Sequence, residues 1–224
     1  MTKTPTAPRK TPLKHMSAAL DGDLAIPLVV DFDGTMQLSD MTLEALLWVL
    51  GTRPWLLGRL MWLYYKRGRA AMKLALEGLA ENYDWIPVLP WEERVLERIA
   101  AEKARGRTVV IVTGSTTKLV KRVVDAKGLD YEVVGTERAD TNLTGPRKAA
   151  ALIARWGAKK FDYIGNSKDD FAVWSESRYA LVVGKSKKIR AGAAKVSEVV
   201  WMVDAERYGV RARLVKRLRR KRKA

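Results

Sequence analysis

Cysteine is absent from the 224 residues of this chain, and histidine occurs only once, as His15. Without cysteine the chain can form no disulfide framework, thiol nucleophile, iron–sulfur cluster or cysteine-based zinc site. His15 lies in a polar segment near the N-terminus, which excludes a Ser-His-Asp triad and a metal site built from several histidines. Any acid–base chemistry must therefore use carboxylates, lysine or tyrosine.

Acidic residues are missing from both ends of the chain. The sequence has 42 Lys and Arg against 25 Asp and Glu, yet residues 1–20 and 207–224 contain basic residues and no acidic ones. We expect a disordered basic arm over residues 1–22 and a basic tail over residues 207–224, with a nearly neutral body between them. The arm lacks the apolar run of a secretory signal peptide, so a cytoplasmic protein is expected.

Short apolar runs alternate with helical patterns along most of the chain. The first run ends at Asp31, is continuous rather than alternating, and is typical of a buried parallel strand. Five more candidate strands follow, at Thr108–Thr113, Tyr131–Gly135, Phe161–Gly165, Tyr179–Gly184 and Glu198–Val203, with helical patterns at about 91–105, 116–127, 146–156 and 168–178. This alternation predicts an α/β fold with a Rossmann-like parallel sheet, built from residues 23–37 and 91–206.

A purely helical block interrupts the alternation after the first strand. Four leucines between residues 43 and 50 are spaced for one helix face, Pro54 can open a second helix, and Arg69–Ala80 supplies a third. A simple crossover between two strands needs far fewer residues. We therefore predict an inserted helical subdomain over residues 38–90.

The strongest chemical signal is the pair Asp31 and Asp33 where the first strand ends. Residues two apart in extended backbone point the same way, so both carboxylates can face the crevice at the carboxyl edge of the sheet, where ligands of open α/β sheets bind. A divalent cation would relieve the repulsion between them. The alternative is a turn in which Asp and Gly serve only turn geometry.

Other strand ends carry polar groups as well. Thr113 and Gly114 end the second strand, where a hydroxyl and backbone N–H groups could hold a phosphate oxygen. Lys148 opens a helix, and Asn166 and Asp170 follow a later strand. Each has a purely structural alternative, as a cap or as a charge favoured by a helix dipole. Their occurrence in this order at successive strand ends favours a shared site.

This order of motifs resembles the haloacid dehalogenase (HAD) superfamily, over about residues 26–185. The resemblance implies that Asp31 is a nucleophile forming an aspartyl-phosphate, and that Asp33 protonates the leaving alcohol and then deprotonates water. It also implies that the helical block is a C1-type cap that closes over the site. A phosphomonoester hydrolase is the function this favours.

The same resemblance assigns the remaining site residues. Thr113, Gly114 and Lys148 would hold the phosphoryl oxygens. Mg²⁺ would be bound by Asp31, Asp33, Asn166 and Asp170, of which the last two lie in the segment 166–170 that follows the strand ending at Gly165, here called the acidic loop. Where the family commonly has Asp after the glycine of that loop, this chain has Asn166. We expect this loss of one negative charge to weaken Mg²⁺ binding, which leaves room for a weakly active or inactive domain.

Three segments, VVDFDGTM, TNLTGPRKAAAL and FDYIGNSKDDFAVW, look more narrowly like the HAD-type domain often fused to UbiA-type prenyltransferases. That likeness implies a prenyltransferase partner and a lipid-linked or prenyl-pathway phosphosugar as substrate.

The predicted cap is rich in Trp and Tyr interspersed with Arg and Lys. These aromatic residues either pack inward in a helical hairpin or lie at the headgroup level of an anionic membrane, on which the basic tail could also dock. The tail could equally bind nucleic acid or remain solvated. Nucleic acid is the less expected partner, because the predicted strands lack interleaved aromatic and basic residues.

Overall fold

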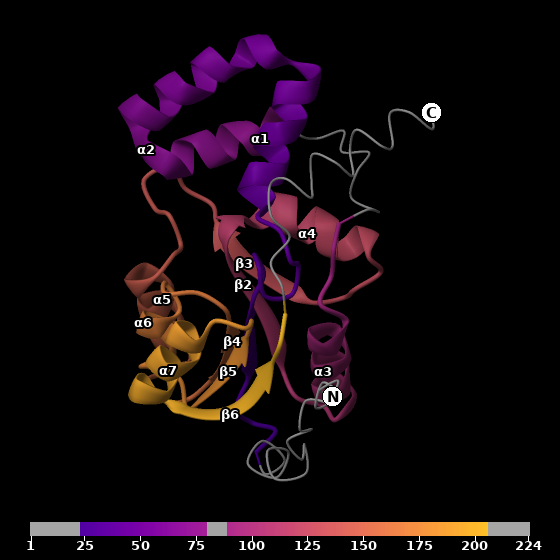
Figure 1. Ribbon diagram of the computed structural model, residues 1–224, viewed down its shortest axis with the longest axis vertical. Coiled ribbons are helices and arrows are strands. Elements are labelled where there is room, and N and C mark those ends of the chain that lie inside the picture. The colour runs from indigo at the N-terminus through magenta and orange to yellow at the C-terminus, as the bar shows by residue number, and fades with distance from the viewer. Residues whose placement is uncertain (1–22, 80–88, 206–224) are drawn as a thin grey trace, which may run out of the picture.

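The computed structural model describes residues 23–79 and 89–205; the predicted arm and tail lie outside the described residues. Its centre is a six-stranded sheet in the order β3-β2-β1-β4-β5-β6, in which every neighbouring pair is parallel (Figure 1). The strands are β1 Leu28–Asp31, β2 Val109–Thr116, β3 Glu132–Thr136, β4 Asp162–Gly165, β5 Tyr179–Val183 and β6 Glu198–Val203. The predicted α/β fold and all six strands are confirmed, with β2 three residues longer than expected at its carboxyl end.

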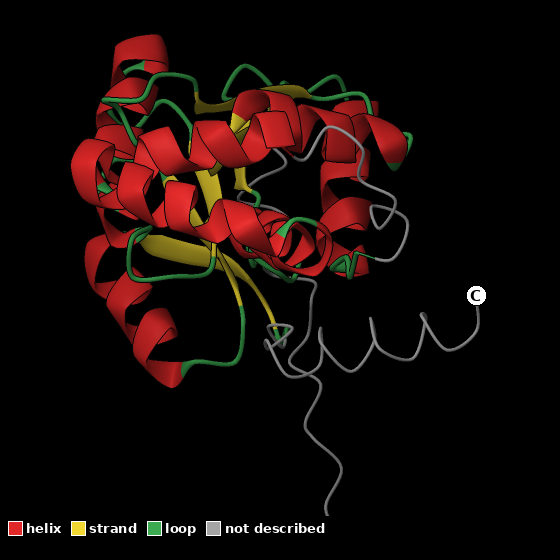
Figure 2. Ribbon diagram, turned by 90° about the horizontal axis from the view of Figure 1, so that it is seen from above, coloured by secondary structure: helices red, strands yellow, loops and turns green. Residues whose placement is uncertain are grey.

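Alternating side chains of the strands fill two apolar layers. In β1, Leu28 and Val30 belong to one layer and Val29 to the other, as the two-residue period of a strand requires. The first layer is covered by α3 (Glu93–Ala104) and α4 (Thr117–Ala126), and the second by α5 (Pro146–Trp156), α6 (Phe171–Trp174) and α7 (Lys187–Val196). Helices consequently lie on both sides of the sheet (Figure 2). Burial on both faces explains why the strand sequences read as continuous apolar runs.

Two helices differ from the sequence prediction. The helix expected over residues 168–178 is only the four-residue α6, because the preceding residues form a loop closed by hydrogen bonds to the Asp170 side chain. The helix α7 was not predicted at all. Its sequence has a weak apolar face, and its Gly192 packs directly on the Phe171 ring, which a Cβ atom at that position would approach to 2.3 Å.

Between β1 and α3 the chain forms α1 (Met41–Thr52), the short 3-10 helix η1 (Pro54–Leu56) and α2 (Leu57–Leu79), as Figure 1 shows at one end of the molecule. The α2 helix kinks at Gly68, whose φ of 82° lies outside the helical range, so the second and third predicted helices meet there. The side chains that α1 buries are Met41, Ala45, Val49 and Glu44, while the predicted leucine face is half-buried.

The two segments that connect these helices to the sheet run side by side. Gln37 pairs with Trp91 in an antiparallel bridge, and the Leu38 N–H donates to the Pro90 carbonyl at 2.9 Å. The helical block therefore leaves and rejoins the sheet at a single point. We refer to α1, η1 and α2 as the cap.

A network of buried ion pairs stabilises the amino edge of the sheet, which lies opposite the predicted site. Arg107 and Asp162 are fully buried and bonded to each other, and Arg107 Nε also donates to the Ile26 carbonyl at 2.7 Å. The Arg178 guanidinium adds two bonds to the same carboxylate, at 3.0 and 2.7 Å. This network ties the starts of β1, β2, β4 and β5 to one another.

Replacing Asp162 by Asn should therefore destabilise the protein strongly. The buried Arg107 would keep only the longer ion pair with Glu102, at 3.4 Å, and breaking a buried ion pair costs about 3–5 kcal/mol. Urea denaturation would measure that loss. The matched control is Asp125→Asn, which removes an exposed partner of Lys121 and should cost less than about 1 kcal/mol. Equal effects of the two variants would contradict a central role for the buried network.

Candidate active site

A cavity of about 110 Å³ opens at the carboxyl edge of the sheet, beneath the cap. Asp31 at the end of β1, Gly114 and Ser115 in β2, and Lys148 in α5 line it from the core. Ser167, Asp169 and Asp170 line it from the loop after β4, and Asp40, Thr42, Arg69 and Lys73 line it from the cap. The fold thus brings into one cavity groups that lie more than 130 residues apart in sequence.

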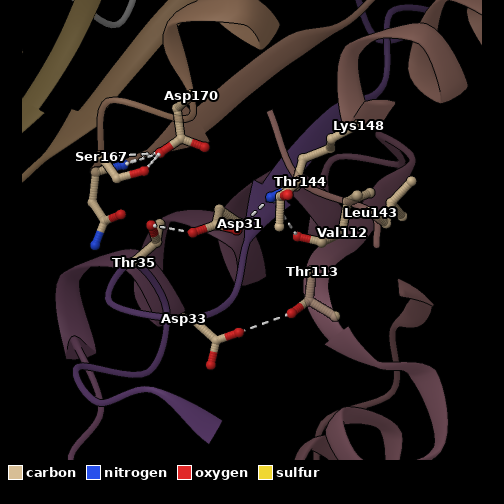
Figure 3. Close-up of polar contacts among 12 residues, drawn as sticks. Asp31, Asp33, Thr35, Val112, Thr113, Leu143, Thr144, Lys148, Ser167 and Asp170 are labelled. Atoms are coloured by element: carbon tan, nitrogen blue, oxygen red, sulfur yellow. Dashed lines mark hydrogen bonds and ion pairs between the residues drawn. The ribbon is translucent and has the colours of Figure 1, made fainter. Parts of the chain in front are cut away.

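A chain of buried, hydrogen-bonded polar groups begins at the cavity wall with Asp31 and Lys148. Lys148 Nζ donates to Asp31 Oδ1 at 2.6 Å, as Figure 3 shows, and to the Tyr163 hydroxyl at 3.0 Å. The Tyr163 hydroxyl in turn donates to Asp170 Oδ1 at 2.8 Å. Thr35 completes the shell of Asp31 by donating to its second oxygen at 3.1 Å. One ammonium group therefore connects the predicted nucleophile to the acidic loop.

Burial and charge pull the pKa values of these groups in opposite directions. Burial raises the pKa of Asp31, Lys148 opposes the rise and the charge of Asp170 adds to it, with a net value of about 7. Burial alone would lower the pKa of Lys148, but the neighbouring carboxylates outweigh it and raise that pKa. Lys148 therefore stays charged, whereas Asp31 becomes a carboxylate only near neutral pH.

Asp33 connects the core to the first turn of the cap. Its Oδ1 accepts the Met41 N–H at 2.7 Å, and its Oδ2 accepts the hydroxyls of Thr113 at 3.0 Å and Ser115 at 2.8 Å. Burial, followed by the charge of Asp40, raises the pKa of Asp33 above its ordinary value, while these hydrogen bonds oppose the rise. A carboxyl group with a raised pKa is suited to donate a proton near neutral pH.

The β2 end of the site differs from expectation at Thr113. Its hydroxyl donates to Asp33 and accepts the Ser115 N–H at 2.9 Å, and the residue does not line the cavity. Gly114 and Ser115 line it instead, because the strand continues past Thr113. Gly114 is closely packed, since a Cβ atom there would lie 2.4 Å from the Thr144 methyl group and would force that side chain to move.

The loop after β4 is organised by Asp170. Its Oδ2 accepts the N–H groups of Asn166 and Ser167 at 2.9 and 2.8 Å and the Ser167 hydroxyl at 2.9 Å. Asp170 lines the cavity beside Asp169, whereas Asn166 does not. Of the four predicted metal ligands, Asp31, Asp33 and Asp170 therefore share the cavity, and Asn166 lies in the adjoining loop without lining it.

The donor chemistry of this cavity fits Mg²⁺. In the described ranges, no three His, Cys, Asp or Glu side chains gather closely enough to form a metal cluster. Mg²⁺ nevertheless needs only one or two protein carboxylates and keeps several waters. Asp31 and Asp170 are buried carboxylates facing one cavity, and the charge of Asp170 already raises the pKa of Asp31. A bound cation would relieve that repulsion.

Sequence reasoning missed two residues of the site. Lys73 in α2 is almost fully buried and donates to the Gly114 carbonyl and to Asn142 Oδ1, the latter at 2.8 Å. Burial, and next the charge of Arg69, lowers the pKa of Lys73 to about 8. The position of Lys73 in the sequence gives no indication that it contacts β2. Tyr163 could have been suspected from the sequence, because a tyrosine in a buried strand needs a hydrogen-bond partner for its hydroxyl.

The family model of haloacid dehalogenase-like hydrolases matches residues 28–173, a range that contains every residue predicted for the site. The chain belongs to this HAD-like hydrolase family. The resemblance inferred from the motif order is thereby confirmed at the level of the family. The narrower likeness to a domain fused to UbiA-type prenyltransferases stays a prediction.

Solved structures share the fold at low sequence identity. A protein with unknown function from Bordetella pertussis Tohama I superposes with a TM-score of 0.56 at 14% identity, covering 77% of this chain and 96% of that one. A substrate-bound phosphoserine phosphatase gives a TM-score of 0.52 at 14% identity, covering 86% of this chain and 97% of that one.

A sequence relative is also found. The uncharacterized protein y4nM of Sinorhizobium fredii is 28% identical over 170 residues, which are 75% of this chain and 32% of that protein. This chain thus matches about a third of that relative.

Replacing Asn166 by Asp should tighten Mg²⁺ binding at least about fivefold, because a further negative charge near Asp170 strengthens attraction for a divalent cation. The same charge adds repulsion when no metal is bound, so the melting temperature should rise more on adding Mg²⁺ than in the unaltered protein. Isothermal titration calorimetry and thermal unfolding would measure both effects. Asn166→Ser adds no charge and should not tighten binding. A variant Asn166→Asp with unchanged affinity would contradict the assigned role of this position.

Proposed function

We propose that the protein is a Mg²⁺-dependent phosphomonoester hydrolase that works through an aspartyl-phosphate on Asp31. The observation that supports this most is the buried contact of Asp31 with Lys148 in a cavity that Asp33 and Asp170 also line. Family membership makes a hydrolase the expected class. Phosphoryl transfer depends mainly on positioning and charge neutralisation, which these groups are suited to provide.

In the first step an Asp31 carboxylate oxygen forms a bond to phosphorus while the bond from phosphorus to the leaving oxygen breaks. Asp33 gives its proton to that oxygen, so a neutral alcohol leaves. The raised pKa of Asp33 favours the protonated form that this step needs. Lys148 lies beside the nucleophile and can hold a phosphoryl oxygen as negative charge spreads.

In the second step a water oxygen forms a bond to phosphorus and the bond to Asp31 breaks. Asp33, now a carboxylate, takes the proton of that water, which returns both residues to their starting states and releases inorganic phosphate. Gly114 and Ser115 line the cavity from β2, and the Ser115 hydroxyl holds Asp33 in place. Asp31, the Asp33 carbonyl and Asp170 would hold Mg²⁺ in the cavity, with Asn166 in the adjoining loop, and the ion would supply positive charge to the site.

Replacing Asp31 by Asn should lower turnover of an aryl phosphate in the presence of Mg²⁺ by at least about a thousandfold, since loss of a nucleophile removes the covalent route. A chromogenic phosphate assay would measure it, with Asp130→Asn, which changes an exposed aspartate at the other edge of the sheet, as the control. Turnover that survives in the variant Asp31→Asn would refute the aspartyl-phosphate mechanism.

Replacing Lys73 by Met should raise KM about tenfold with a smaller effect on kcat, because a charge-assisted contact contributes about 1.5–3 kcal/mol. Above pH 8 the unaltered protein should show a rising KM, since Lys73 loses its proton near a pKa of about 8, and the variant Lys73→Met should not. Initial rates across pH would test this. Lys66→Met, on an exposed part of α2, is the control; a KM rise above pH 8 in both variants would exclude Lys73 as its source.

Asn166 favours a second candidate, a weakly active HAD domain that serves as a membrane-associated partner of a prenyltransferase. Loss of one acidic ligand would weaken metal binding and with it catalysis. Turnover of aryl phosphate that is both Mg²⁺-dependent and lost in Asp31→Asn would separate the first candidate from the second. A screen of phosphorylated metabolites that includes polyprenyl-linked sugar phosphates would then test the substrate class that we expect.

A further inference from the structure

The cap carries a concentration of exposed aromatic side chains. Of the eight exposed large apolar residues in the described ranges, five lie between residues 55 and 65. They are Trp55, Met61, Trp62, Tyr64 and Tyr65, with exposed fractions of 73, 51, 55, 49 and 82%. We call these five residues the cap patch. Scattered single apolar residues are ordinary on a protein surface, but a cluster of this kind marks an interaction site.

The patch does not face the core. Leu60 is the buried residue in this part of α2, whereas Tyr65 lies four positions after Met61 and three after Trp62, so these three exposed side chains share the outer side of the helix. Trp48 in α1, by contrast, packs against the core. The inward-packing alternative considered from sequence therefore holds for Trp48 and is wrong for the patch.

The charged residues that neighbour the patch in the sequence all have one sign. Between Arg53 and Leu76 the chain has six basic residues and no acidic one. Arg59, Lys66, Arg67 and Arg69 are exposed, and Lys66 Nζ lies 5.5 Å from the centre of the Tyr65 ring. Trp and Tyr with Lys and Arg beside them are typical of surfaces that lie at the headgroup level of an anionic bilayer.

We propose that the cap patch docks on an anionic lipid surface. Within the described residues no helix has the length and apolar character of a membrane span, so docking would be peripheral. The proposal stands on the cap surface and does not depend on catalysis. Figure 1 shows the cap as one end of the molecule, and Arg69 and Lys73 of the same α2 helix line the cavity, so a docked cap would bring that cavity close to lipid headgroups.

Flotation of the full chain with phosphatidylcholine vesicles, with and without phosphatidylglycerol, tests this directly. We expect binding to the anionic vesicles, accompanied by a blue shift of tryptophan emission. The triple variant Trp55→Ser, Trp62→Ser and Tyr65→Ser should bind at least about tenfold more weakly, because apolar burial drives interfacial binding. Exposed apolar residues elsewhere provide the matched control, Leu24→Ser with Met202→Ser, which should bind as the unaltered protein does.

Several outcomes would overturn the proposal. One is the absence of binding to anionic vesicles; another is binding that the triple variant retains in full, which would assign it to residues outside the patch. A dimer in vesicle-free solution that the triple variant dissociates would identify a second copy of this chain as the occupant. The melting temperature of the triple variant should match that of the unaltered protein, which would show that the fold is kept. If it does not, the milder variant Trp55→Ser alone serves for the same binding test. Turnover of aryl phosphate, measured separately, keeps this result independent of the proposed function.

Discussion

The buried contact between Lys148 and Asp31 is the interaction on which the site depends. Two opposite charges taken out of water are costly, and they are tolerated only where their mutual attraction and further hydrogen bonds compensate. Tyr163 and Thr35 provide those bonds, and Asp170 continues the chain into the acidic loop. The strand ends of β1 and β4 and the start of α5 are thereby held in one arrangement.

The two edges of the sheet use buried charge for different purposes. At the amino edge, Arg107 and Arg178 surround Asp162, so that the carboxylate is fully paired. At the carboxyl edge, the Lys148 ammonium contacts Asp31 directly and reaches Asp170 only through the Tyr163 hydroxyl, and burial raises the pKa of Asp31. At the amino edge the charges are balanced, and the ion pairs stabilise the strand starts. The carboxyl edge keeps an excess of negative charge, which a bound cation or a proton would neutralise.

The cap bonds to the core beside this excess charge. The Met41 N–H at the start of α1 binds Asp33, and Lys73 in α2 binds the Gly114 carbonyl of β2. Both contacts join cap and core beside the cavity, and the two connecting segments leave the sheet at one paired point near Gln37. Movement of the cap would therefore change the surroundings of Asp33 and the positive charge over the cavity together.

The sequence by itself determined the parallel α/β fold, the six strands and the helical insertion, because burial on both faces of a sheet and the helical period are local patterns. It also placed Asp31, Asp33, Lys148 and Asp170 at strand or helix ends. Only the tertiary structure decided that Thr113 turns to Asp33, that Lys73 enters the cavity, and that Tyr163 bridges Lys148 and Asp170. These contacts join residues that are distant in sequence. Which residues meet depends on how the helices and strands pack, and local sequence patterns do not specify that packing.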